Sequence, residues 1–269
     1  MKEMTLKEIQ DYGLEMMKDI HAFCVANNIK YTLGGGSMLG AIRHKGFIPW
    51  DEDVDVFMLR QDYEKFCSMY KSSHYKLIKG GDSYLCFARV YDDKETVTVS
   101  KAPWCDRKTG AWIDVFPLDG APDDENVYNR QLAEARKLWE KTTYLRVAVS
   151  PLSSRKGFAA KMRLMLKKVA TMNGKDLRKT VNEFDAVCRR VEPGKSNHYA
   201  LLVFPAPRAN LYNEYSTFDS CVLAPFETEQ FYIVRDWDTV LKNEFGDYMQ
   251  LPPKDKQVPR LENTTFYWK

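Results

Sequence analysis

The amino-acid sequence predicts an α+β fold, with a mixed β-sheet core flanked by helices and a mainly helical C-terminal part. Three observations support this fold class. Short strand patterns alternate with helical patterns over residues 1–120, longer helical patterns occupy much of residues 124–191, and 44% of the 269 residues are apolar. We expect a core at residues 1–122 and a second part at residues 123–269 that packs back on it, so that the two can also form one domain.

The first elements follow from the spacing of apolar side chains. Apolar residues recur every three to five positions over residues 6–28 and predict one amphipathic helix. The apolar run Ile29–Leu33 predicts a strand, and residues 37–44 predict a brief helix that a glycine and a proline end. Alternating apolar residues predict a strand over residues 53–58, and a helix is expected after it over residues 61–70.

Four further strands are predicted before residue 120. Three of them are Tyr75–Ile78, Tyr84–Tyr91 and Thr96–Val99, and the polar turn between the last two predicts a hairpin. The fourth is Ala111–Phe116, which the turn signal Pro117–Gly120 closes.

The second part of the chain changes character. Residues 124–147 and 155–191 are predicted to be largely helical. A last strand, Gln230–Val234, and a helix, Asp238–Met249, come before Pro252–Pro253, which is a signal that ends a helix.

Charge and hydropathy exclude several classes of protein. A formal net charge of +3 is too small to indicate a nucleic-acid partner. The N-terminus is charged, unlike a signal peptide, and no apolar run approaches the roughly 18 residues that cross a bilayer. The six cysteines are scattered without a CxxC pair, which predicts reduced, mostly buried thiols. We therefore expect a cytoplasmic protein.

The strongest functional signal is the glycine-rich run that begins at Gly34. Without Cβ atoms, Gly35 and Gly36 let backbone amides approach a phosphate closely. A helix that begins near Ser37 would point its N–H groups at that anion, and the Ser37 hydroxyl can add a donor. A tight turn between a strand and a helix is the alternative explanation of the glycines.

Paired carboxylates follow this run. On a strand, Asp53 and Asp55 project from the same face, and two such carboxylates repel unless a cation or proton lies between them. A pair of hard oxygen ligands beside a phosphate suits Mg²⁺, with Mn²⁺ as the alternative ion. Asp51 and Glu52 can support the site from behind the ligands. The alternative is an exposed acidic turn that leads into a strand.

A third carboxylate, Asp114, is the single charge inside an otherwise apolar strand. Burial of an unpaired charge is costly, so Asp114 is a candidate metal ligand or acceptor of a proton from an attacking hydroxyl. The alternative is that it faces solvent on a one-sided strand.

A basic tripeptide, Arg43, His44 and Lys45, follows the glycine run. Arg43 can hold phosphate oxygens with two parallel hydrogen bonds, while Lys45 supplies a point charge. The alternative is a polar helix end with cations at its C-terminus. His44 is placed near the site without a catalytic role, because a structural histidine is the commoner case.

Three segments together, Gly34–Asp55, Trp112–Gly120 and Phe245–Pro253, resemble the LicD family of phosphotransferases, which is related to fukutin-related protein and has a nucleotidyltransferase-like fold. The resemblance covers most of the chain. It implies a catalytic core with a metal ion. It also implies transfer of a phospho-alcohol, typically phosphocholine, from a CDP-linked donor to a glycan or its precursor, as in lipopolysaccharide or teichoic acid biosynthesis.

The resemblance also implies roles for individual residues. The run from Gly35 to Ser37 matches the phosphate-binding loop of the family, and Arg43–Lys45 matches its basic tripeptide. Asp53 and Asp55 match the metal-binding pair, and Asp114 matches the later acidic position. An acceptor hydroxyl would then attack the phosphorus that carries the alcohol, in line with the departing CMP.

Two other functions fit the same motifs. A nucleotidyltransferase that uses an NTP donor would have the same glycine loop and paired aspartates. A non-catalytic module that binds nucleotide or glycan would also keep them. The transferred alcohol stays open: Trp50, Trp104 and Trp112 can cage a quaternary ammonium group through cation–π contacts, or they can simply pack.

One basic segment bears on the acceptor. Residues 155–179 contain nine Lys or Arg residues and one acid, and five apolar residues between Phe158 and Val169 share a helical face. Such a stretch can lie on an anionic membrane, where lipid-linked glycan precursors are held, at the inner face of the cell membrane. The alternative is a core helix with a solvated basic face.

Overall fold

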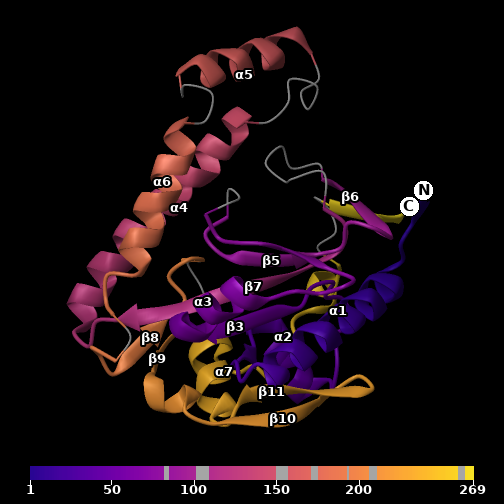
Figure 1. Ribbon diagram of the computed structural model, residues 1–269, viewed down its shortest axis with the longest axis vertical. Coiled ribbons are helices and arrows are strands. Elements are labelled where there is room, and N and C mark those ends of the chain that lie inside the picture. Colours follow the sequence, from indigo (N-terminus) through magenta and orange to yellow (C-terminus); the bar gives the residue numbers. More distant parts are fainter. Residues whose placement is uncertain are drawn as a thin grey trace.

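The structure confirms the α+β class. A mixed β-sheet lies at the centre with helices packed against it, and two long helices form an arm that leads away from it (Figure 1). This computed structural model describes residues 1–81, 85–100, 109–149, 157–170, 175–192, 194–205, 211–259 and 264–269.

The main sheet has the strand order β2-β3-β7-β5-β4, and β8 and β9 continue it from the far half of β7. β3 and β7 run parallel, while the other neighbours in this sheet are antiparallel. The strands are β2 (Thr32–Leu33), β3 (Asp55–Leu59), β4 (Lys76–Ile78), β5 (Ala88–Tyr91), β7 (Trp112–Ala121), β8 (His198–Ala200) and β9 (Tyr212–Glu214).

Two strands of this sheet differ from their predicted lengths. β5 begins at Ala88, later than the predicted Tyr84, which lies outside the described residues. β7 does not end at Phe116, because residues 117 and 118 continue the parallel ladder with β3 and residues 119–121 pair with β8. The turn signal around Pro117 is overridden by these two partner strands.

Two smaller sheets complete the strands. β10 (Cys221–Phe226) and β11 (Glu229–Val234) form an antiparallel hairpin, of which only β11 was predicted. β1 (Lys2–Glu3), β12 (Thr264–Trp268) and β6 (Thr96–Ser100) form a three-stranded sheet that brings the two chain ends together (Figure 1).

The turn over residues 92–95 exists, but the predicted hairpin around it is wrong. β5 pairs with β4 and β7, whereas β6 pairs with β12 in another sheet. The buried Asp92 carboxylate accepts backbone hydrogen bonds from Lys94, Glu95 and Thr96, and this turn directs the chain out of the main sheet. Turn residues mark a reversal of the chain, but they do not decide which strands pair on either side.

Seven α-helices surround these sheets in the described part of the chain. The first confirms the predicted amphipathic helix: it begins with a capping box between Thr5 and Glu8, and its apolar face is buried. The helices are α1 (Leu6–Ala26), α2 (Gly35–Arg43), α3 (Arg60–Met69), α4 (Glu125–Val149), α5 (Phe158–Ala170), α6 (Lys175–Cys188) and α7 (Trp237–Phe245), with short 3₁₀ helices at Tyr215–Phe218 and Lys254–Lys256.

The largely helical stretch predicted over residues 155–191 contains two helices, α5 and α6. α4 and α6 pack side by side as the arm, and α5 lies across its tip, far from the sheet (Figure 1). Residues 150–156 and 171–174, on either side of α5, lie outside the described residues. Among the residues that the structure describes, no helix is long and apolar enough to span a membrane.

α7 ends earlier than the predicted helix, which extends to Met249. Its last residue is Phe245, and Gly246 follows with a φ of 69°, a left-handed conformation that glycine adopts at low cost. Gly246 therefore ends the helix before the proline pair. This early end leaves Asp247–Pro253 to form part of the pocket described below.

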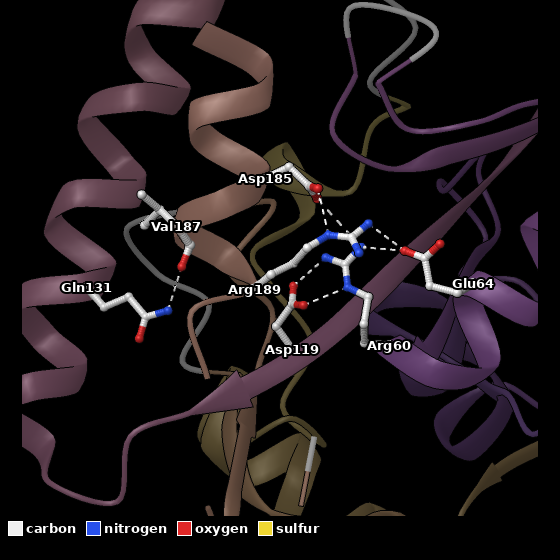
Figure 2. A network of polar contacts seen from close by, with 7 residues as sticks. All are labelled: Arg60, Glu64, Asp119, Gln131, Asp185, Val187 and Arg189. Carbon is white, nitrogen blue, oxygen red and sulfur yellow. Dashed lines mark hydrogen bonds and ion pairs between the residues drawn. The ribbon is translucent and has the colours of Figure 1, made fainter. Parts of the chain in front are cut away.

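A buried ion pair ties the arm to the sheet. Arg60 on α3 donates two hydrogen bonds to Asp119 on β7, with nitrogen–oxygen distances of 2.6 and 2.7 Å. Glu64 and Asp185 lie at the edge of this pair, and Arg189 bridges them (Figure 2). The network joins α3, β7 and the end of α6, so that the strand that carries Asp114 is fixed at its far end.

Candidate active site

A pocket of about 720 Å³ opens where the start of α2, the start of β3 and the end of α7 meet. Its lining includes Arg43 and aromatic rings from several elements. Five of its carboxylates come from four separate segments, and Asp247, which follows α7, is a sixth. The five are Asp51, Asp53, Asp55, Asp114 and Glu244. This pocket therefore gathers most of the residues that the sequence marked as functional.

The glycine run is fastened to the start of β3. The Gly34 N–H donates to the Asp55 carbonyl at 2.9 Å, and the Asp55 N–H donates to Ser37 Oγ at 2.9 Å. α2 begins at Gly35, two residues earlier than predicted. Gly35 and Gly36 line the pocket. The Ser37 hydroxyl instead accepts this bond from Asp55, so the structure gives it a positioning role.

The two glycines at the start of α2 stand against carboxylates. Gly35 has a φ of 49°, and a Cβ there would lie 3.6 Å from Glu244 Oε1. A Cβ on Gly36 would lie 2.7 Å from Asp51 Oδ2, which is closer than side-chain carbons approach oxygen. Gly35 is favoured by its positive φ, whereas at Gly36 a side chain would displace the Asp51 carboxylate.

We expect Gly36→Ala to displace the Asp51 carboxylate and lower activity by about tenfold or more, because small shifts of catalytic groups have large effects on rate. The loss of stability should stay near 1 kcal/mol, since alanine is itself a good helix former. Activity and thermal unfolding of the variant check this. Gly13→Ala on α1 is a control for the glycine change, because a Cβ at Gly13 would make only ordinary contacts, 3.8 Å from Phe47 and from Val54. Unchanged activity in Gly36→Ala would contradict the close packing of the loop.

The register of the main sheet brings two of the carboxylates together. Asp55 on β3 stands directly opposite Asp114 on β7 in the parallel ladder. Asp53 precedes β3 and is exposed, so it is not on the strand as predicted, although it lines the same pocket. Burial, and then the negative charges of four other carboxylates, raise the pKa of Asp55 well above its usual range.

Asp114 has a partner that the sequence did not predict. Arg89 on β5 donates to both carboxylate oxygens of Asp114, at 2.7 and 3.0 Å, and its guanidinium lies 4.3 Å from the ring centre of Trp112. Arg89 and Asp114 are also opposite each other in the antiparallel ladder. Asp114 is thus a paired charge rather than a solvent-facing one, and its negative charge is partly balanced before any ligand binds.

Glu244 is a site residue that sequence analysis missed. It lies on the last turn of α7, two hundred residues from the glycine run, and its Oε2 atom is buried without a hydrogen-bond partner in the described part of the chain. Burial raises the pKa of Glu244 to about 7. A signal existed: Glu244 stands just before the Phe245–Pro253 segment that carries the family resemblance.

The basic tripeptide divides between the pocket and its surroundings. Arg43 lines the pocket, donates to the Tyr248 carbonyl at 2.7 Å and donates to His44 Nε2 at 2.9 Å. Burial, and then the Arg43 charge, lower the pKa of His44. Among the described residues that line this pocket, neither His44 nor Lys45 is present. Lys45 is exposed, and Glu52 lines a smaller neighbouring pocket.

The loop that carries Asp51 is held from two sides. Gln10 on α1, which is buried, donates to the Asp51 carbonyl at 2.8 Å. The turn of the β10–β11 hairpin supports the same loop, because Glu227 Oε1 accepts the Phe47 N–H at 3.0 Å. Elements from both ends of the chain therefore position the acidic side of the pocket.

The donor set fits a divalent cation. Six carboxylates line one pocket, and a buried oxygen of Glu244 lacks a partner among the described residues. Hard carboxylate oxygens are the ligands that Mg²⁺ takes, together with waters and phosphate oxygens. Within the described ranges, however, no group of three or more His, Cys, Asp or Glu side chains is placed so that it could hold a metal ion as it stands. The ligand set Asp53, Asp55 and Asp114 therefore stays a prediction.

The three predicted tryptophans do not form one cage in the described structure. Trp50 lines the pocket, whereas Trp112 packs between Arg89 and Phe266. Trp104 lies outside the described residues. The aromatic side of the pocket is built mainly by other rings, which include Phe57, Phe87, Phe116, Phe204 and Tyr248.

Comparisons with known proteins identify relatives of this chain. The family described as LicD/FKTN/FKRP, nucleotidyltransferase domain, matches residues 28–164, about half of the chain. The lipopolysaccharide cholinephosphotransferase LicD of Haemophilus influenzae is 29% identical over 270 aligned residues, which cover 96% of this chain and 97% of that protein. Ribitol 5-phosphate transferase FKRP of mouse and human is 51% identical over 37 residues, 14% of this chain and 8% of FKRP.

Proposed function

The chain belongs to the LicD/FKTN/FKRP nucleotidyltransferase domain family, and from this premise we propose that it is a phosphotransferase that moves a phospho-alcohol from a CDP-linked donor to a glycan hydroxyl. The family assignment confirms the resemblance found in the sequence motifs. The relative with the longest match quoted above is a cholinephosphotransferase of lipopolysaccharide, so phosphocholine and a lipopolysaccharide acceptor are the first substrates to test.

The observation that carries this proposal is the juxtaposition of a glycine loop and six carboxylates in one pocket. A pyrophosphate donor is an anion, and carboxylates alone would repel it. The pocket contains the means to reverse this repulsion, because its oxygen ligands suit a cation and Arg43 adds a fixed positive charge. A simple anion site would not carry so many acids.

Several residues would act on the donor. Asp53 and Asp55 would hold a magnesium ion, with Mn²⁺ as the alternative, and the bound ion would supply positive charge beside the donor pyrophosphate. Backbone N–H groups at Gly35 and Gly36 would donate to its oxygens, at the positive end of the α2 dipole. Arg43, which is held by the Tyr248 carbonyl, would donate from the other side of the loop.

The acceptor hydroxyl would lose its proton to a carboxylate of the pocket. Asp114 or another carboxylate was the expected acceptor, and both oxygens of Asp114 already accept hydrogen bonds from Arg89. Glu244 is the better candidate, because its Oε2 atom is without a hydrogen-bond partner among the described residues and lies in the same pocket. The hydroxyl oxygen would then form a bond to the phosphorus that carries the alcohol, and CMP would depart on the opposite side. We place this reaction in the cytoplasm, with a glycan or its lipid-linked precursor as acceptor.

We expect one CDP-alcohol to raise the thermal unfolding midpoint by several degrees in the presence of Mg²⁺. A ligand at about 100 times its dissociation constant adds roughly 2.7 kcal/mol of stability. The panel contains CDP-choline, CDP-ribitol, CMP and the four NTPs, each with Mg²⁺ or with EDTA. The shift should vanish in Asp53→Asn. A shift with an NTP instead would favour nucleotidyl transfer, and no shift with any nucleotide would contradict the proposal.

A further inference from the structure

The apolar face of α5 is turned toward solvent. Phe158, Leu166 and Val169 are 80%, 62% and 72% exposed, and Met162 and Met165 are exposed beside them. A core helix would bury this face and expose its cations. The alternative reading of the sequence, in which this segment is a core helix with a solvated basic face, is therefore wrong for α5.

The exposed face is one continuous stripe. At about 100° per residue, the five side chains fall within a sector of about 100° around the helix axis. Leu164 points to the opposite side and is 3% exposed, so it is the residue that faces the rest of the chain. Tyr144 on α4, which packs against α5, is also exposed.

Cations flank this stripe on both sides. Lys161 and Lys168 fall on one side of the sector, and Arg163 falls on the other. α5 contains no acidic residue. Lys167 lies further round the helix, toward α4, where its ammonium lies over the Tyr144 ring, 3.2 Å from the ring centre.

We propose that α5 is a docking helix for an anionic lipid membrane. Its apolar stripe would enter the boundary between headgroups and acyl chains, while the flanking Lys and Arg side chains would reach the lipid phosphates. The charge pattern favours lipid over a second copy of this chain, because face-to-face packing of two α5 helices would bring six flanking cations together without any acid from α5.

The position of α5 suits this role. It lies at the tip of the arm formed by α4 and α6, away from the sheet and from the termini (Figure 1). A membrane could therefore contact α5 without touching the glycine loop. This inference does not depend on the transfer chemistry. Docking through α5 would also hold the pocket near a lipid-linked acceptor.

Co-sedimentation of the whole chain with sucrose-loaded vesicles tests the proposal. We expect binding to phosphatidylcholine vesicles that contain phosphatidylglycerol, little binding to pure phosphatidylcholine, and release at high salt, which screens the charges. Phe158→Ser with Leu166→Ser should weaken binding by about 100-fold. Lys161→Glu with Arg163→Glu should weaken it by at least about 30-fold, since each cation near an anionic surface contributes about fivefold.

Matched controls keep the result interpretable. Val127→Ser removes an exposed apolar residue from α4, and Lys254→Glu with Lys256→Glu reverses two exposed cations elsewhere. Neither should change vesicle binding. The α5 side chains that are substituted are exposed, so circular dichroism and the unfolding midpoint should match the wild type.

Three outcomes would overturn the proposal. The first is that the wild-type chain stays in the supernatant with every vesicle. The second is that both α5 variants still bind the vesicles. The third is self-association in sedimentation velocity that Phe158→Ser with Leu166→Ser abolishes while vesicle binding is absent, because a second copy would then cover the stripe.

Discussion

Asp55→Asn should reduce the transfer rate by about 1,000-fold or more and, at the same time, leave the folded chain as stable as before or more stable. The negative charges of four other carboxylates repel that of Asp55, and this repulsion destabilises the folded state. The amide keeps the size of the side chain but removes one charge. Without metal we expect a gain of about 1 kcal/mol, or roughly 2–4 °C in the unfolding midpoint.

The opposite signs of the two effects make this variant informative. Substitution of a residue that only supports the fold would lower both stability and activity. Substitution of a carboxylate that is kept for chemistry should lower activity alone. Activity and stability are measured on one preparation. Activity is the release of nucleotide from the donor that the thermal unfolding panel identifies, and stability is the unfolding midpoint in EDTA. Asp11→Asn, an exposed aspartate on α1 paired with Lys7, should change neither. Full activity of Asp55→Asn would exclude Asp55 from the reaction.

Arg60→Met should destabilise the chain by about 3–5 kcal/mol, the largest stability effect that we expect from one substitution. Asp119 is 1% exposed, and its two oxygens accept hydrogen bonds from Arg60. Removal of the guanidinium leaves a buried carboxylate without its partner. The unfolding midpoint should fall by about 10 °C, and urea unfolding should give the free-energy difference.

The double variant Arg60→Met with Asp119→Leu separates this cause from a general packing defect. When both charges are replaced by apolar side chains of similar size, most of the loss should be recovered, because no unpaired charge remains. Arg190→Met is the surface control: its partner Glu134 is exposed, so the expected loss is below about 1 kcal/mol. A double variant as unstable as Arg60→Met alone would contradict the explanation.

Local signals predicted much of the site. Glycines at positions 34–36 mark a strand-to-helix turn, and the single charge of Asp114 in an apolar strand marks a second edge of the same site. The parallel register places Asp55 opposite Asp114, and no local sequence pattern contains information about this pairing. The sequence could suggest that the two carboxylates meet, but only the sheet order brings them side by side.

Partners distant in sequence were not predictable in this way. Arg89 reads as an ordinary strand residue until β5 pairs with β7 and places it against Asp114. Glu244 reads as one of several charges on an amphipathic helix until α7 packs beside the glycine loop. Both depend on tertiary pairing, and local propensity carries no information about it.

The most direct test of the proposed function is identification of the phosphorus-containing products by ³¹P NMR and mass spectrometry. The chain is incubated with Mg²⁺, lipopolysaccharide and the donor that raises its unfolding midpoint. We expect CMP to accumulate in step with an acceptor whose mass increases by one phospho-alcohol. Pyrophosphate with a nucleotide on the acceptor, or an unchanged acceptor beside an intact donor, would contradict the assignment as a phosphotransferase of CDP-linked alcohols.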